Sequence, residues 1–271
     1  MIKIESLSEG QYENIINDNC PSFSGIVAGE CKGNLWVDNI EKPKIAIADS
    51  YAVGSFAFLG SINNEDENMT LRNYIISDIF NFLKQKGIYY FEYSVESDGL
   101  KPYIQKMFEG KKIQSEKEYS FRITESINKN YLLPDNLKMQ RVDFDLWSKV
   151  MNGEFINDSF LTKRLLESWG SFDNFEKKSI GFCITYLDNI VAVIIGTARF
   201  KNIIPIDIET IDEFKHRGLG YSLTIEFVNQ CIQRGLIAQW DCVESNSISR
   251  KLAEKAAFKL FNENEVFWFQ I

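Results

Sequence analysis

The second half of the chain alternates between short apolar runs of strand length and longer segments in which apolar residues recur at helical spacing. Leu219, Leu223 and Phe227, for example, lie on one face of a predicted helix that Gly235 ends. The elements predicted in this half are strands at 179–187, 190–199 and 203–210, a helix at 218–234, a strand at 239–243, a helix at 247–255 and a strand at 266–271.

The first half follows the same order. Thr70 suits the N-cap of a helix that Gly87 ends, and an aromatic strand follows it. The elements predicted here are strands at 44–48 and 52–59, a helix at 70–86, a strand at 89–95, a short helix at 102–108 and a closing strand at 119–124. A strand followed by a helix and another strand implies some parallel pairing, so each half is predicted to be a mixed α/β unit.

An internal repeat relates the two halves. Residues 85–88 match residues 233–236, and residues 95–100 match residues 243–248, at the same offset of 148 positions. In both copies an amphipathic helix ends at the glycine, an apolar strand follows, and a second short helix comes next. The chain is therefore predicted to contain one structural plan twice.

The boundary between the copies is predicted in the polar segment 125–136, which contains Pro134. This places one domain at 1–126 and a second at 127–271, each large enough to bury a core of its own. Residues 136–169 are expected to form helices that open the second domain.

Composition narrows the class of protein. The 271 residues carry a net charge of −8 and are 45% hydrophobic, which is typical of a soluble globular protein and argues against nucleic-acid binding. Five cysteines without a CxxC pair argue against a disulfide framework or a metal site. The chain shows no signal region and no apolar run of the roughly 18 residues that a membrane span needs. A cytoplasmic location without membrane contact is expected.

The candidate binding site lies at the start of a predicted helix. The strand at 203–210 leads into this helix through a glycine-containing loop, residues 215–220. The start of a helix presents unpaired N–H groups and the positive end of its dipole, which together bind phosphates. Gly218 and Gly220 permit close approach, and Lys215 and Arg217 add positive charge. The sequence therefore predicts a phosphate-binding site in the second copy.

This loop resembles the signature Arg/Gln-x-x-Gly-x-Gly/Ala of the GNAT superfamily of N-acetyltransferases, which binds the pyrophosphate of coenzyme A. The segment 240–258 resembles the strand and helix that follow that signature. Within the superfamily, zwittermicin-resistance-type acetyltransferases show further similar positions. These are Leu133, Pro134, Trp169, Gly181, Phe182, Cys183, Ile208, Glu209, Thr210, Trp240, Asp241, Cys242, Asn246 and Ser249. The resemblance is good over 131–258 and weaker over 1–125.

The resemblance implies two tandem GNAT-like domains, with acetyl-CoA as the acetyl donor and no metal. Backbone amides of the strand at 208–211 are expected to support the acetyl group, and this strand is expected to diverge from 239–243 to open a slot for the thioester arm. The residues expected to bind the coenzyme are Ile208, Thr210, Ile211, Lys215, His216, Arg217, Gly218, Leu219, Gly220, Tyr221, Asn246 and Ser249.

Three positions depart from the family pattern. Lys215 stands where Arg or Gln is usual, which keeps charge but loses the planar fork of arginine. Ala257 stands where Gly is usual before the phenylalanine. Ala253 stands where many members carry a tyrosine that protonates the departing thiolate, so a water, Ser249 or Tyr221 remains as the acid.

Glu209 is the predicted general base, acting directly or through a water. Asp207 and Glu209 alternate with Ile206 and Ile208, so both carboxylates face the same side of the strand. The alternative is that they form its solvated face, and Asp241 and Glu244 are further carboxylates near the slot. Asn246 has the alternative role of a helix cap. His216, the single histidine, fits an exposed loop residue and lacks the context of a catalytic triad.

The first copy lacks the features of a phosphate site. Glu67, Thr70 and Arg72 stand at the offset positions of Lys215, Gly218 and Gly220, and the run 65–67 is acidic. We therefore expect coenzyme in the second copy only. The degenerate first copy then either shapes the acceptor site or supports the fold.

The predicted activity is direct transfer of an acetyl group to a primary amine, within a ternary complex, by a monomer or homodimer. Similarity to antibiotic-resistance members favours a small-molecule acceptor. Two alternatives remain. One is a non-catalytic acyl-CoA sensor or scaffold, which the alanine at position 253 favours. The other is a protein N-acetyltransferase, for which the acidic charge would suit a basic peptide.

Overall fold

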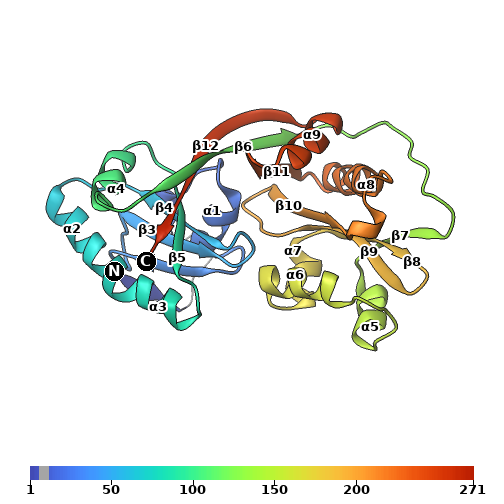
Figure 1. The fold of residues 1–271 in the computed structure, drawn as a ribbon, viewed down its shortest axis with the longest axis horizontal. Helices are drawn as coiled ribbons and strands as arrows, with labels where there is room; N and C mark the ends of the chain where they lie inside the picture. The colour runs from blue at the N-terminus through green and yellow to red at the C-terminus, as the bar shows by residue number, and fades with distance from the viewer. Residues whose placement is uncertain (6–11) are drawn as a thin grey trace. The chain divides into compact units, whose positions relative to one another are not determined.

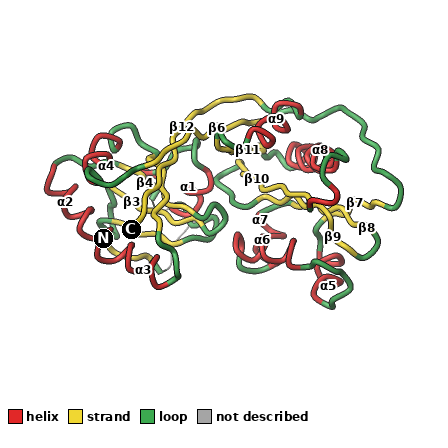
Figure 2. Tube along the Cα trace, in the orientation of Figure 1, coloured by secondary structure: helices red, strands yellow, loops and turns green. Residues whose placement is uncertain are grey.

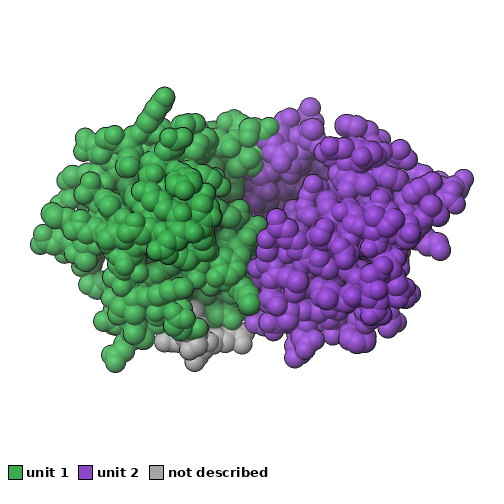
Figure 3. Space-filling view, turned by 60° about the horizontal axis from the view of Figure 1, so that its bottom comes forward, with its two compact units in different colours: residues 1–118, 243–245, 263–271 green, residues 119–242, 246–262 purple. Residues whose placement is uncertain are grey.

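The computed structural model describes residues 1–5 and 12–271, and these form two compact units (Figures 1 and 3). Unit 1 comprises Met1–Glu118, Val243–Ser245 and Glu263–Ile271, and unit 2 comprises Tyr119–Cys242 and Asn246–Asn262. Each unit is built around strands with helices packed against them (Figure 2). The mixed α/β fold predicted from the sequence is confirmed.

Unit 1 has the strand order β1-β2-β3-β4-β5-β12. Its pairs are antiparallel except β4 with β5, which are parallel. Its strands are β1 (Ile2–Ile4), β2 (Asn34–Val37), β3 (Ile45–Ser50), β4 (Ser55–Gly60) and β5 (Tyr90–Val95). Its helices are the 3₁₀ turn η1 (Glu13–Ile15), α1 (Pro21–Val27), α2 (Glu65–Tyr74), the π-helical turn η2 (Ile75–Ile79), α3 (Phe80–Gln85) and α4 (Lys101–Met107).

Two apolar clusters form the core of unit 1. One joins α1 to alternate residues of the strands, such as Val37, Ala46 and Leu59. The other joins α2, α3 and α4 to the intervening residues, such as Ile47 and Phe58. Because side chains alternate along a strand, the two clusters lie on opposite faces of the sheet.

Unit 2 has the strand order β6-β11-β10-β9-β8-β7, with β10 and β11 parallel. Its strands are β7 (Leu137–Arg141), β8 (Gly181–Tyr186), β9 (Asn189–Gly196), β10 (Ile203–Thr210) and β11 (Ile237–Val243). Its helices are α5 (Phe144–Met151), α6 (Ser159–Trp169), α7 (Phe172–Lys178), the 3₁₀ turn η3 (Asp212–Phe214), α8 (Leu219–Gln233) and α9 (Ser247–Lys255). Helices throughout 136–169 were expected, which is wrong at its start because Leu137–Arg141 alternates in strand fashion and pairs with β8.

The helices of unit 2 cover its sheet on both faces. Figure 1 shows α8 on one side of β9 and β10 and α6 with α7 on the other. A large apolar cluster joins α8 and α9 to the strands, with Leu223 and Phe227 at its centre. On the other face the indole N–H of Trp169 in α6 donates to the Gly196 carbonyl at 2.8 Å, which ties α6 to β9.

Two long strands, β6 (Gln114–Ile123) and β12 (Lys259–Gln270), each have residues in both units. Tyr119, Phe121 and Ile123 of β6 are buried in the core of unit 2, where β6 neighbours β11. The end of β12 pairs antiparallel with β5 in unit 1. The closing strand of each sequence repeat thus completes the other unit, so the compact units differ from the predicted division at residue 126.

The described residues contain no helix with the length and apolar character needed to cross a membrane. They also contain no group of three or more His, Cys, Asp or Glu side chains arranged to hold a metal ion.

Candidate active site

Strands β10 and β11 diverge partway along their length. They pair in parallel over 203–205 and 237–239, and residues 206–210 then pair with β9. Pro205 is the last residue of β10 that pairs with β11. The divergence expected from the sequence is therefore confirmed.

The alternation of hydrogen bonds along β10 directs two amides into this opening. The N–H of Ile211 donates to Val191 on β9, and the carbonyl of Pro205 accepts from Thr197 on β9. In an antiparallel pair such bonds recur every second residue, so the N–H groups of Ile208 and Thr210 point away from β9. Ile208 and Thr210 thus offer donors at the opening, whereas the predicted donor Ile211 is engaged in the sheet.

A cavity of about 540 Å³ opens in unit 2 at this divergence. It is lined by Ile208, Glu209, Thr210, Phe214, Lys215, His216, Gly218, Leu219, Gly220, Tyr221, Trp240, Asn246, Ile248, Ser249, Leu252 and Lys255. The lining includes every residue predicted to bind coenzyme except Ile211 and Arg217. Arg217 instead stacks its guanidinium 4.7 Å from the Phe214 ring and donates to the Glu213 carbonyl.

The loop that enters α8 presents its backbone to the cavity. Gly218 has φ of +81°, a left-handed conformation that favours glycine, and no side chain caps the helix that begins at Leu219. The first N–H groups of α8 are therefore available to an anion. At Gly220 a β-carbon would lie 3.2 Å from the Leu252 side chain, so the absence of a side chain allows close approach.

Positive side chains stand around this helix terminus. The ammonium of Lys215 lies 2.6 Å from the Asp212 carboxylate and holds the pKa of that carboxyl below its usual value. The ammonium of Lys255 lies 4.7 Å from the centre of the Tyr221 ring. Lys255 was not predicted from the sequence, although Ile248, Leu252 and Lys255 are spaced so as to share one face of α9.

The start of α9 forms the opposite wall. Asn246 caps the helix by accepting from the Ser249 N–H at 3.1 Å, as its alternative interpretation proposed. The Ser249 hydroxyl accepts from the indole N–H of buried Trp240 at 2.8 Å, so its own proton is directed elsewhere. Ala253 is fully buried in the apolar core and carries no proton donor.

Glu209, the predicted base, is bound by an arginine. The Arg164 guanidinium, from α6, forms an ion pair with Glu209 and donates from Nε to Asp207 at 2.8 Å. Both carboxylates face the same side of β10, as predicted, and their side chains are 43% and 49% exposed, as the alternative of a solvated face also expects. Arg164 was not predicted from the sequence, because it lies 43 residues before Asp207.

Asp241 on β11 has a different set of partners. The amide of Gln239 donates to both of its oxygens, at 2.9 and 3.1 Å, and the Ser120 hydroxyl also bonds it. The Arg122 guanidinium donates to the other end of Gln239 at 2.9 Å. Burial is the largest influence and raises the pKa of Asp241 from 3.8 to about 6.

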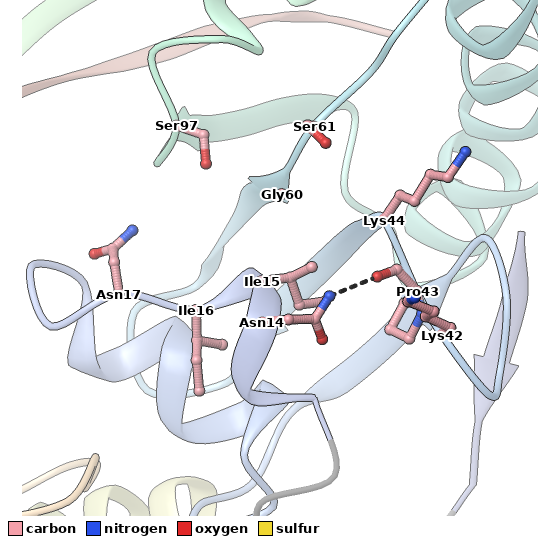
Figure 4. Close-up of a pocket in the computed structure, with 10 residues that line it drawn as sticks. All are labelled: Asn14, Ile15, Ile16, Asn17, Lys42, Pro43, Lys44, Gly60, Ser61 and Ser97. Carbon is pink, nitrogen blue, oxygen red and sulfur yellow. Dashed lines mark hydrogen bonds between the residues drawn. The ribbon is translucent and has the colours of Figure 1, made fainter.

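Unit 1 has a cavity of about 470 Å³, shown in Figure 4. It is lined by Asn14, Ile15, Ile16, Asn17, Lys42, Pro43, Lys44, Gly60, Ser61 and Ser97. The nearby start of α2 is already satisfied. Asn64 caps it, and the Glu67 carboxylate accepts the Asn63 N–H at 2.9 Å and pairs with Lys44 at 3.6 Å. A carboxylate of the chain itself thus occupies the anion-binding end of this helix, which begins with three acidic residues.

Comparison with known proteins identifies the class to which this fold and site belong. The profile of the GNAT acetyltransferase family matches residues 13–267, so the chain belongs to that family. Membership of this family implies acetyl-CoA as the donor.

Individual relatives are more distant. The chain is 28% identical over 143 residues to the uncharacterized N-acetyltransferase YdfB of Bacillus subtilis (strain 168). This match covers 53% of the chain and 52% of YdfB, so the chain spans about half the length of that curated relative.

Solved structures with the same fold cover most of the chain. A GCN5-related N-acetyltransferase-like protein from Streptococcus suis 89/1591 matches with a TM-score of 0.59 at 18% identity, covering 88% of each chain. A tandem GNAT protein from the clavulanic acid biosynthesis pathway matches with a TM-score of 0.57 at 7% identity, covering 89% of this chain and 83% of that one.

Proposed function

We propose that this chain transfers the acetyl group of acetyl-CoA to a primary amine of a small molecule, within a ternary complex. The observation that carries the proposal is the cavity of unit 2, where the diverging strands meet the uncapped start of α8. A cavity of this kind suits a ligand that has a long neutral arm and phosphates at one end.

The roles of the residues follow from their places around the cavity. The first N–H groups of α8, with Lys215 and Lys255 beside them, bind the pyrophosphate of the coenzyme. The N–H groups of Ile208 and Thr210 hold the pantetheine arm and polarise the acetyl carbonyl. When bound, the coenzyme supplies the activated acetyl group. The Ser249 hydroxyl and the Tyr221 phenol line the cavity and are the candidate donors to the departing sulfur.

The acceptor amine is proposed to approach from the face of the sheet that carries Asp207 and Glu209. These two carboxylates share one guanidinium, so the cluster keeps an excess of negative charge that attracts an ammonium group. Similarity to zwittermicin-resistance-type acetyltransferases agrees with a small, amine-bearing acceptor met in the cytoplasm by a monomer or homodimer.

The N-terminal GNAT-like domain, residues 1–126 in the sequence-based division, is proposed to bind no coenzyme. The Glu67 carboxylate at the start of α2 supports this, because it would repel a phosphate and already accepts a backbone N–H. One molecule of acetyl-CoA per chain is the consequence, bound within residues 127–271.

A second candidate function is a non-catalytic acyl-CoA sensor. The burial of Ala253 favours it, because the usual acid is absent from α9. Turnover separates the two candidates, since a sensor binds the coenzyme without releasing its thiol.

The experiment mixes the purified full chain with acetyl-CoA and a panel of primary amines, measuring thiol release and the mass of each amine product. We expect thiol release that depends on an amine and is lost in a Gly220→Asp variant, whose carboxylate occupies the phosphate position. Coenzyme binding without thiol release across the panel would support the sensor instead.

A further inference from the structure

We propose that Asp241 accepts the proton of the acceptor amine, and that Glu209, held by Arg164, positions the acceptor as a fixed anion. This assignment rests on the proposed acetyl transfer and divides the roles of two carboxylates within it. It differs from the sequence-based expectation, in which Glu209 is the base.

Both carboxylates lie on one face of unit 2. On β11, Trp240 packs into the apolar cluster of α8 and α9, so its neighbour Asp241 points to the opposite face. On β10, Ile208 packs against the same cluster, so Glu209 also points to the opposite face. Asp241 lies two residues beyond Gln239, the last residue of β11 that pairs with β10. It therefore stands at the opening between the strands.

The partners of the two carboxylates differ in charge. Glu209 is paired with the guanidinium of Arg164, which carries a permanent positive charge. Asp241 is bonded by the neutral groups of Gln239 and Ser120. A carboxylate with neutral partners in a partly buried site is the better proton acceptor near neutral pH.

The surroundings of Asp241 fix its orientation. The Arg122 guanidinium lies 3.9 Å from the Phe261 ring centre and donates to the carbonyl end of Gln239. That bond turns the amide NH₂ of Gln239 toward Asp241, which leaves lone pairs of the carboxylate for an incoming proton. Arg122 and Gln239 are therefore positioning residues in this proposal.

Burial is the main influence on the pKa of Asp241. Arg122 from β6 lowers it, whereas burial raises it by more, to about 6. Asp207 and Glu209 from β10 and Arg164 from α6 are further charged groups on this face. A base with this pKa is ionised at neutral pH and matches the range in which general bases work well.

The proton balance of the step is simple. The ammonium group of the acceptor gives one proton to Asp241, and the neutral nitrogen then forms a bond to the acetyl carbon. The bond from that carbon to sulfur breaks, and the second proton of the nitrogen ends on the sulfur. Asp241 returns its proton to solvent, so the products are an amide and a thiol.

The test is the pH dependence of kcat/KM for acetyl-CoA and the panel amine that the wild type acetylates fastest. The wild type is expected to lose activity below pH about 6. The Asp241→Asn variant should lose about a hundredfold or more of kcat and also lose this acid limb. Glu209→Gln should raise the KM for the amine and keep the acid limb.

The Arg122→Gln variant tests the proposal through the pH of the acid limb, which a purely structural effect of the substitution would leave unchanged. Removing the guanidinium raises the pKa of Asp241, so the acid limb should shift to higher pH, and kcat at high pH should fall because Gln239 loses the bond that orients its amide. Acetyl-CoA affinity measured by calorimetry reports whether the Asp241 and Arg122 variants are folded, because neither residue lines the coenzyme cavity.

The inference fails if the wild type is active and Asp241→Asn keeps kcat within about threefold, or if Glu209→Gln removes the acid limb. An unmoved acid limb in Arg122→Gln would also contradict it. Failure of the proposed function looks different, because the wild type then releases no thiol with any amine of the panel.

Discussion

At the scale of single residues, the site is defined by how its carboxylates are paired. Asp207 and Glu209 are tied to Arg164, whereas Asp241 is held by an amide and a hydroxyl. The carboxylates on β10 thus share a cationic partner, whereas the carboxylate on β11 has neutral hydrogen-bond partners and a raised pKa. A buried carboxyl group with a raised pKa is typical of sites that move a proton.

The raised pKa of Asp241 also predicts a dependence of stability on pH. Between pH 3.8 and about 6 the folded chain holds a proton on Asp241 that the unfolded chain has lost. The free energy of unfolding therefore falls as pH rises through this window, and ionised Asp241 costs up to about 3 kcal/mol above it. Asp241→Asn does not titrate. Its stability relative to the wild type should increase from pH 4 to pH 7, measured by urea unfolding.

A relative stability that is constant across these pH values would contradict the raised pKa. Asp207→Asn is the matched control, because its carboxylate lies on the same face but is paired with Arg164. The stability of this control relative to the wild type should not increase between pH 4 and pH 7.

Residue pairing is the part of the site that the sequence did not reveal. The loop 215–220 could be identified because a strand, two glycines and a helix follow one another in the chain. Arg164 with Glu209, and Arg122 with Gln239, come together only through tertiary packing. No local spacing connects these partners.

At the scale of elements, the end of α9 shows why the family favours glycine at one position. The N–H of Phe258 donates to the Ala253 carbonyl and the N–H of Ala257 to the Glu254 carbonyl, which is the bond pattern of a Schellman motif. This motif needs a left-handed residue, and Ala257 has φ of +66°. The departure from glycine noted in the sequence therefore carries backbone strain.

Ala257→Gly is expected to raise the free energy of unfolding by about 1 kcal/mol, because glycine adopts positive φ without a steric cost. Thermal and urea unfolding measure the change. Ala256→Gly is the matched control, since Ala256 has φ of −81° and is fully buried. The same substitution there should destabilise the protein, and a loss of stability in Ala257→Gly would contradict the account.

Most elements were predicted well where one periodicity prevails. The strand at 203–210 has the predicted bounds, and α8 differs from its predicted bounds by one residue at each end. The start of α2 was predicted five residues late, at Thr70. Asn64 supplies the N-cap instead. The first turn of α2 is polar, so no apolar residues at helical spacing indicated that the helix begins there.

At the scale of the whole molecule, the boundaries of the two sequence repeats differ from the boundaries of the two compact units. The strand that closes each repeat contributes to the core of the other unit. Each repeat ends in an apolar strand, so the sequence could predict both strands but not which neighbour each one takes. Strand partners are chosen by tertiary packing, which the pattern within one strand does not specify.

Phe269→Ala tests this division. The Phe269 side chain is 2% exposed and packs on Phe80, Phe91 and Phe108 in unit 1. Its removal should cost about 3–5 kcal/mol and lower the hydrogen-exchange protection of β5 amides, although the residue ends the second repeat. Phe261→Ala, on the same strand but 38% exposed, is the control and should leave β5 protected. Loss of protection confined to unit 2 in Phe269→Ala would contradict the assignment.

The central claim is that acetyl-CoA binds once per chain, at the start of α8. Calorimetric titration of acetyl-CoA into the wild type, Gly220→Asp and the control Ser159→Asp tests it directly. Ser159→Asp adds the same charge at the start of α6, away from the cavity. The account predicts one site with micromolar affinity, about −8 kcal/mol, that Gly220→Asp abolishes and Ser159→Asp keeps. Two sites per chain, or unchanged binding by Gly220→Asp, would contradict it.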